Sequence, residues 1–211
     1  AAEGLVSGRN ACLEQRGTHF YASVQDFHIL WPILQIGKEK VDTMDVLTAV
    51  EQRRSVRSYS DQELTREQID KLLRAAHLAP SARNRQEWKF IAVDDKELIK
   101  KIAEISGQEF AGEAPLILAG VGLEPERVMR CGIPPYIVDV TIAMTQVTLL
   151  AVEMGLGTCW IGGYPQDEVR KLLGVPEKHQ IVMLLTVGYP REQPEARPRK
   201  PFEEVVSYNK F

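Results

Sequence analysis

The chain has 211 residues, of which 44% are hydrophobic and 26% are charged, and its formal net charge is -3 at pH 7. These values are ordinary for a soluble globular domain, and they do not favour nucleic acid or an anionic membrane as the main partner. The three cysteines, Cys12, Cys131 and Cys159, have no CxxC spacing. We therefore expect neither a disulfide framework nor a structural metal site, and a reducing cytoplasm is the simplest compartment.

Residues 1–43 differ from the rest because they show no sustained helical or strand period. Their one apolar patch, at residues 29–34, is too short to span a bilayer and is interrupted by Pro32. It lacks the flanking features of a signal peptide. The segment is interpreted as a peripheral arm without catalytic duties, with an upstream translation product as the alternative, and the functional domain is expected to cover residues 44–211.

From residue 44 onward, helical and strand patterns alternate along the chain. We expect a first helix from Asp45 to about residue 54, and a second after the capping box formed by Thr65 and Gln68. The further expected helices cover residues 96–105, 136–154 and 169–173, and the expected strands cover residues 88–93, 115–121, 158–161 and 181–187. This order predicts an α/β or α+β fold in which helices cover a mixed sheet.

The segment from Tyr136 to Met154 is the longest expected helix and is apolar on almost every side. Such a helix should be buried all round. Asp139, Gln146 and Glu153 interrupt it at intervals of seven, and these polar groups make a membrane span improbable. The stripe indicates either a row of satisfied interfacial or capping contacts or, as we favour, a dimer seam beside a cofactor.

A first chemical cluster is formed by Arg53, Arg54, Ser55 and Arg57. In an extended loop Arg53, Ser55 and Arg57 point the same way, and guanidinium forks beside a hydroxyl suit the oxygens of a phosphate. A solvated basic helix end is the alternative, because cations there complement the helix dipole.

A second cluster runs from Pro80 to Trp88, where a helix ends and a loop leads into a strand. Small residues allow close approach to a flat ligand, and Asn84 and Gln86 offer paired amide donors and acceptors of the kind that a flavin edge requires. The alternative is a plain turn between helix and strand, which would not need the amides.

Neither glycine-rich segment, residues 120–122 or 155–163, matches the GxGxxG fingerprint, so a Rossmann nicotinamide site is absent and any NAD(P)H must dock transiently elsewhere. Gly162 and Gly163, at a strand end, could place bare backbone against an aromatic ring. In the tail, Arg197 and Arg199 lie in a proline-flanked, extended segment.

Taken together, these clusters resemble the nitroreductase family of FMN enzymes over roughly residues 44–205. The marks appear in one order: an RRSxR segment at 53–57, a PSxxNxQxW segment at 80–88, GLGTCWIGG at 155–163, and a terminal RxRKP. The resemblance implies an α+β fold in which two chains interlock as a homodimer and build two FMN sites at their interface.

The resemblance also assigns roles to residues of this chain. Arg53, Arg54, Ser55 and Arg57 would hold FMN from one subunit, with Arg199 and Arg197 on the phosphate. The other subunit would contribute Pro80, Ser81, Ala82, Asn84 and Gln86, and Gly162 and Gly163 would lie near the reactive flavin N5. Two features depart from the family pattern: Glu87 stands where proline is usual, and residues 107–135 are short compared with forms that carry a long substrate lid.

The implied activity is hydride transfer from NAD(P)H through the flavin to small organic acceptors such as nitroaromatics and quinones. The flavin carries the chemistry, so no dedicated catalytic side chain is expected, and Arg57 is the candidate for stabilising negative charge near flavin N1. His77 is interpreted as a structural or surface residue and Cys159 as a small buried apolar one. Reductive dehalogenation, flavin fragmentation and a non-enzymatic FMN-binding redox sensor are the alternatives.

Overall fold

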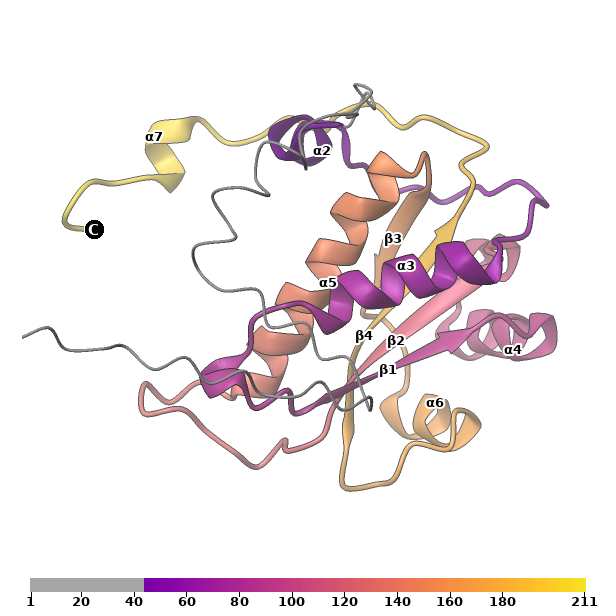
Figure 1. Ribbon diagram of the computed structural model, residues 1–211, viewed down its shortest axis with the longest axis horizontal. Coiled ribbons are helices and arrows are strands. Elements are labelled where there is room, and N and C mark those ends of the chain that lie inside the picture. The colour runs from indigo at the N-terminus through magenta and orange to yellow at the C-terminus, as the bar shows by residue number, and fades with distance from the viewer. Residues whose placement is uncertain (1–43) are drawn as a thin grey trace, which may run out of the picture. The chain divides into compact units, whose positions relative to one another are not determined.

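The computed structural model describes residues 44–211 (Figure 1). The expectations for residues 1–43, including the arm, the apolar patch and Cys12, lie outside the described residues.

Four strands form the sheet at the centre of this unit. In chain order they are β1 (Trp88–Val93), β2 (Leu116–Gly122), β3 (Gly157–Ile161) and β4 (Gln180–Gly188). Their spatial order is β1-β2-β4-β3, and all three pairings are antiparallel. The α+β class is therefore confirmed. Within residues 44–211, the parallel part of the expected mixed sheet is limited to a single bridge, between Ser55 and Thr158.

Helices cover both faces of the sheet. Helices α3 (Arg66–His77) and α5 (Pro135–Glu153) cover one face, and α4 (Lys96–Ser106) and α6 (Gln166–Leu172) cover the other. The remaining elements are α2 (Val46–Gln52), which packs on α5, α7 (Phe202–Val205) in the tail, and the 3-10 turns η1 (Ala82–Asn84) and η2 (Glu109–Glu113). The Thr65 side chain accepts a hydrogen bond from the Gln68 backbone amide, and the Gln68 side chain accepts one from the Thr65 backbone amide. The predicted capping box at the start of α3 is therefore confirmed.

The two faces have separate cores because side chains alternate along a strand. Leu116 and Leu118 of β2 join a cluster with α3 and α5, whereas Ile117 and Ala119 join one with α4 and α6. All seven residues of β2 are buried, as its continuous apolar run predicts. In Figure 1, α3 and α5 lie together on the face toward the viewer.

Helix α5 packs on the sheet along one side only. At Gly120 of β2, an added Cβ would collide with Met144, so the glycine allows the helix to approach the strand closely. The opposite side leaves Ile137, Val138 and Ile142 exposed. The expectation that α5 is buried all round is therefore wrong within one chain, because the sheet and α3 cover only part of its circumference.

The residues of the polar stripe of α5 differ in burial, and Gln146 is half-buried while Glu153 is exposed. Asp139 is buried, and Glu153 lies 4.0 Å from Lys71 of α3. Among residues 44–211, α5 alone is long and apolar enough to cross a bilayer, but it packs against β2, β4 and α3 as a core helix does.

Candidate functional site

The arginine loop, residues 53–57, lies along the outer edge of β3. The Val56 amide donates to the Thr158 carbonyl at 2.9 Å, and Ser55 forms the parallel bridge with Thr158. Val56 is buried against Gly157, where an added Cβ would lie 2.7 Å from Val56 Cγ2. The loop is therefore extended, which is the condition under which Arg53, Ser55 and Arg57 are expected to point the same way. The absence of a side chain at position 157 sets the distance of the loop from the strand.

Tyr59 fixes the end of this loop from inside the core. Its side chain is fully buried, and its hydroxyl donates to the Val56 carbonyl at 2.8 Å and lies 2.7 Å from the Thr186 hydroxyl. Burial raises the pKa of the Tyr59 phenol above its ordinary value, so the group stays protonated and keeps its donor. The backbone at Val56 is thus tied to β4 as well as to β3.

A cavity of about 480 Å³ opens beside the arginine loop. The charged and polar residues that line it are Glu51, Arg53, Arg54, Ser55, Arg57, Glu195, Arg197 and Arg199. Five guanidinium groups thus face two carboxylates, and such an excess of fork-shaped donors is complementary to an anionic ligand. The structure brings the first cluster and the tail together in one place, although they are separated by about 140 residues of sequence.

Two arginines of this cavity have partners within the chain. Arg54 Nη1 donates to the carbonyls of Glu51 and Arg53, and the Arg57 guanidinium lies 5.9 Å from the centre of the Phe110 ring. Both contacts fix the direction of a guanidinium without neutralising its charge. Arg54 and Arg57 therefore keep their positive charge for a ligand.

The amide loop, residues 80–87, has an unusual backbone. Arg83, Asn84 and Gln86 all have a left-handed φ, at 58°, 53° and 55°. Residues with side chains rarely adopt this region, and each such position costs about 1–3 kcal/mol unless the surroundings enforce it. Backbone strain of this kind is often found at ligand-binding sites. The left-handed backbone therefore supports the loop as a candidate binding site independently of its amino-acid composition.

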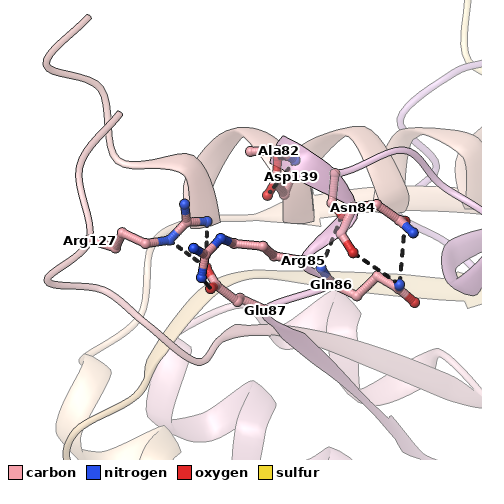
Figure 2. A network of polar contacts seen from close by, with 8 residues as sticks. Ala82, Asn84, Arg85, Gln86, Glu87, Arg127 and Asp139 are labelled. Carbon is pink, nitrogen blue, oxygen red and sulfur yellow. Dashed lines mark hydrogen bonds and ion pairs between the residues drawn. The ribbon is translucent and has the colours of Figure 1, made fainter. Parts of the chain in front are cut away.

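Asp139 of α5 and Ser81 enforce this conformation. Both carboxylate oxygens of Asp139 accept from the Ala82 amide, at 3.1 and 3.2 Å, and Ser81 Oγ accepts from the Gln86 amide at 3.0 Å. Gln86 Nε2 lies 3.3 Å from Asn84 Oδ1, so the two amides face each other at the tip (Figure 2). The loop is thus preorganised from the first turns of α5.

Glu87, which departs from the family pattern, holds two arginines. Its carboxylate lies 2.6 Å from Arg127 Nε and 3.2 Å from Arg85 Nη1 (Figure 2). Arg127 belongs to the segment that follows β2, and the Leu123 amide donates to the Glu87 carbonyl at 3.0 Å. The substitution therefore couples the amide loop to residues 123–134.

The remaining candidates lie outside the arginine cavity. Gly162 and Gly163 are exposed and follow directly after β3. His77 is the last residue of α3 and is exposed, in agreement with its interpretation as a structural or surface residue. Cys159 is buried, and burial raises the pKa of its thiol, against a smaller lowering by Arg57 and Arg53. The thiol is therefore neutral, in agreement with its interpretation as a small apolar residue.

The two main clusters lie near opposite ends of α5. The amide loop bonds to Asp139 near the start of the helix, whereas the arginine loop packs on Gly157 and Thr158, just beyond its end. At a rise of 1.5 Å per residue, the stretch from Asp139 to Glu153 alone spans about 20 Å. One chain therefore does not bring the arginine and amide clusters into a single site.

Sequence reasoning missed three residues that shape these clusters. The sequence pattern places Asp139 in the polar stripe of the long helix, and no pattern marks Tyr59 or Arg127 as a site residue. A carboxylate inside an otherwise apolar helix is a signal of a buried partner, because burying an unpaired charge is costly. The partner itself lies 57 residues away in sequence and has no local mark.

Comparisons with known proteins agree on one family. The model of the nitroreductase family matches residues 50–117 and 136–189. An FMN reductase [NAD(P)H] of Bacillus subtilis is 34% identical over 180 residues, which cover 76% of this chain and 72% of the relative. An NAD(P)H nitroreductase-type protein of Archaeoglobus fulgidus is 36% identical over 155 residues, covering 71% and 87%. The structure of an FMN-dependent nitroreductase from Clostridium difficile is similar with a TM-score of 0.69 at 31% identity, covering 78% of this chain and 99% of that one.

Proposed function

The chain belongs to the nitroreductase family, and we propose that it passes hydride from NAD(P)H through FMN to small organic acceptors such as nitroaromatics and quinones. It is an oxidoreductase, and its cofactor is FMN with NAD(P)H as the reductant. The observation that carries the proposal is the convergence of the arginine loop with Arg197 and Arg199 on one cavity.

The residues of this cavity fit FMN. A terminal phosphate monoester carries close to two negative charges at neutral pH, and guanidinium forks bind its oxygens bidentately. Arg197 and Arg199 reach the cavity from the tail, and Arg53 and Ser55 reach it from the edge of β3. Two separate segments thus offer donors to one anion, which suits a phosphate better than a solvated helix end.

FMN supplies the hydride-accepting and hydride-donating chemistry when bound, and the chain holds and polarises it. Arg57 keeps its charge while its guanidinium lies over Phe110, so it offers a fixed cation to the flavin. A fixed cation stabilises the negative charge that two-electron reduction produces and favours hydride transfer over single-electron steps.

The site is proposed to be shared between two copies of the chain. The arginine and amide clusters lie near opposite ends of α5. This helix exposes Ile137, Val138 and Ile142, and α2, which packs on α5, exposes Val46, Leu47 and Val50. Burying such a face is favourable by roughly 25 cal/mol per Å² of apolar surface. A two-fold axis across α5 would place the arginine cluster of one copy beside the amide cluster of the other.

In this arrangement the second copy brings its amide loop to the flavin ring. The proposed contacts from that copy are Pro80, Ser81, Ala82, Asn84 and Gln86. Gly163 has room for a flat group, because an added Cβ there meets no atom within 4 Å, whereas at Gly162 an added Cβ would lie 3.3 Å from Met183 Sδ. These assignments rest on the exposure of the glycines and on the preorganised backbone of the loop.

The chromophore and its reduction test the proposed function. Protein purified without added flavin is expected to be yellow, and mass spectrometry of the released chromophore should identify FMN. Anaerobic titration with NADH or NADPH should bleach the flavin absorbance, and nitroaromatics or quinones should restore it. Sole release of FAD, or a flavin that neither nucleotide bleaches, would contradict the proposal.

Subunit complementation tests the shared site. Protein carrying Arg53→Ala and Arg57→Ala is mixed with protein carrying Asn84→Ala and Gln86→Ala under conditions that allow subunit exchange. Heterodimers should contain one intact site and regain FMN binding, whereas neither parent binds well alone. Verified exchange without recovered binding would show that both clusters act within one chain.

A further inference from the structure

A second cationic cavity lies between the amide loop and the segment that follows β2. It has a volume of about 390 Å³ and is lined by Ala82, Arg83, Arg85, Arg127, Val128, Met129 and Arg130. Four arginines thus face one cavity, and no carboxylate lines it. This feature is separate from the arginine cavity at the other end of α5, which the FMN phosphate would occupy.

Only part of this charge is neutralised by the chain itself. Glu87 pairs with Arg127 and Arg85. Among the ion pairs of residues 44–211, none involves Arg83 or Arg130, and both residues are exposed. Arg83 and Arg130 therefore line the cavity without an ion pair in the described part of the chain, and Glu87 holds the guanidinium groups of Arg85 and Arg127.

The amide loop presents its two kinds of side chain in different directions. Asn84 and Gln86 lie against each other, whereas Arg85 extends toward Arg127 (Figure 2). Arg83, with its left-handed backbone, lines the same cavity as Arg85. One loop thus brings its two amides together at its tip and contributes Arg83 and Arg85 to the lining of the cavity.

The segment after β2 closes the cavity from the other side. The Met129 amide donates to the Ile133 carbonyl at 2.9 Å, and the Gly132 amide donates to the Met129 carbonyl at 2.8 Å. These bonds form a turn that carries Arg130. The pairing of Arg127 with Glu87 then attaches this segment to the amide loop, so the two backbone segments that carry the four arginines are held together.

We propose that this cavity binds the 2′-phosphate of NADPH and makes NADPH the preferred reductant. The inference rests on the proposed function, in which the amide loop borders the flavin and the nicotinamide ring reaches the same place. A phosphate monoester is a compact, doubly charged anion that several guanidinium forks can share. NADH lacks this group and would leave Arg83 and Arg130 solvated.

Two arginine variants and one matched control test the inference. Arg83→Ala and Arg130→Ala each remove a free guanidinium, and Arg74→Ala removes an exposed arginine of α3 that does not line the cavity. The wild-type protein should have a lower KM for NADPH than for NADH. Each cavity variant should raise the NADPH KM by about 10-fold, as expected for loss of a charge-assisted hydrogen bond, and leave the NADH KM unchanged.

Equilibrium binding provides a readout that does not depend on turnover. Adenosine 2′,5′-bisphosphate should bind the FMN-loaded protein more tightly than 5′-AMP in calorimetric titrations. This difference should shrink in Arg83→Ala and Arg130→Ala and persist in Arg74→Ala. Raising the ionic strength should lower the binding affinity of the bisphosphate more than that of 5′-AMP, because added salt screens the charges of an exposed arginine cluster.

The failures of the two proposals are distinguishable. Equal KM values for both nucleotides in the wild type, or variants that affect NADH and NADPH alike, would overturn the phosphate site while the oxidoreductase function stands. Equal binding of the bisphosphate and 5′-AMP would overturn it as well. A flavin that neither nucleotide reduces would instead contradict the proposed function, and the calorimetric comparison would still decide what the cavity binds.

Discussion

Replacing Asp139 tests whether α5 holds the amide loop in its ligand-binding shape. The buried carboxylate accepts from the Ala82 amide with both oxygens. Hydrogen bonds to charged groups contribute about 1.5–3 kcal/mol, and neutral ones contribute about 0.5–1.5 kcal/mol. Asp139→Asn should therefore weaken the contact by about 1 kcal/mol, and Asp139→Ala should remove it.

Loss of this contact should reduce FMN affinity more than it reduces stability. Arg83 and Gln86 are left-handed, and such positions cost about 1–3 kcal/mol each, so an unrestrained loop relaxes toward ordinary backbone. Binding of FMN must then restore the strained loop. If relaxation of the unbound loop releases about 2 kcal/mol of strain, binding has to supply that energy, and the FMN dissociation constant rises by about 30-fold. Asp139→Asn should raise it by about 5-fold.

Fluorescence titration of the apoprotein with FMN measures this change, and thermal unfolding measures stability in parallel. Asp70→Ala is the matched control, because Asp70 forms an exposed 3.2 Å ion pair with Arg66 on α3 and does not contact the loop. Exposed pairs of this kind contribute roughly 0–1 kcal/mol. If Asp139→Ala lowered stability while FMN affinity stayed at the value of the control, the carboxylate would support the helix but not the loop.

Three further predictions concern other parts of the chain. Gly157→Ala would place a Cβ 2.7 Å from Val56 Cγ2 and displace the arginine loop, so FMN affinity should fall while far-UV circular dichroism is retained; unchanged affinity would show that the loop can shift freely. Arg199→Ala should lower FMN affinity by about 10- to 150-fold and leave riboflavin binding unchanged, with partial recovery in Arg199→Lys, whereas equal losses for both flavins would place Arg199 away from the phosphate. Burial raises the pKa of Tyr164 from 10.0 to about 12, so the folded state favours the protonated phenol; its contribution to stability is complete below pH 10 and is lost as the pH rises toward 12. Urea unfolding across this range should show a smaller decline in Tyr164→Phe than in the wild type, and identical declines would refute the assignment.

Local patterns were sufficient to predict most elements of the fold. The strand expected at residues 88–93 has those bounds in the structure, because Trp88 opens an apolar run between two loops. The long helix expected at residues 136–154 is α5, with ends shifted by one residue. These signals succeed because hydrophobic period and capping are properties of neighbouring residues.

Pairings between distant residues could not be read in the same way. The order β1-β2-β4-β3 depends on which buried strands meet, and several buried apolar runs look alike in sequence. The contact between Glu87 and Arg127 joins residues 40 apart, and nothing in either local sequence indicates the other. The left-handed backbone at Arg83 was equally hidden, because arginine is not a residue that this conformation favours.

The position of the arginine loop along β3 also bears on aggregation. β3 is an edge strand, and edges with free amides and carbonyls can pair with strands of other molecules. Val56 and Ser55 occupy part of this edge at Thr158, and the neighbouring arginines add a row of like charges that opposes stacking of identical chains. A substitution that detaches the loop would thus expose the unpaired backbone groups of β3. The protein should then aggregate, and its soluble yield should fall even where the activity of the soluble fraction is unchanged.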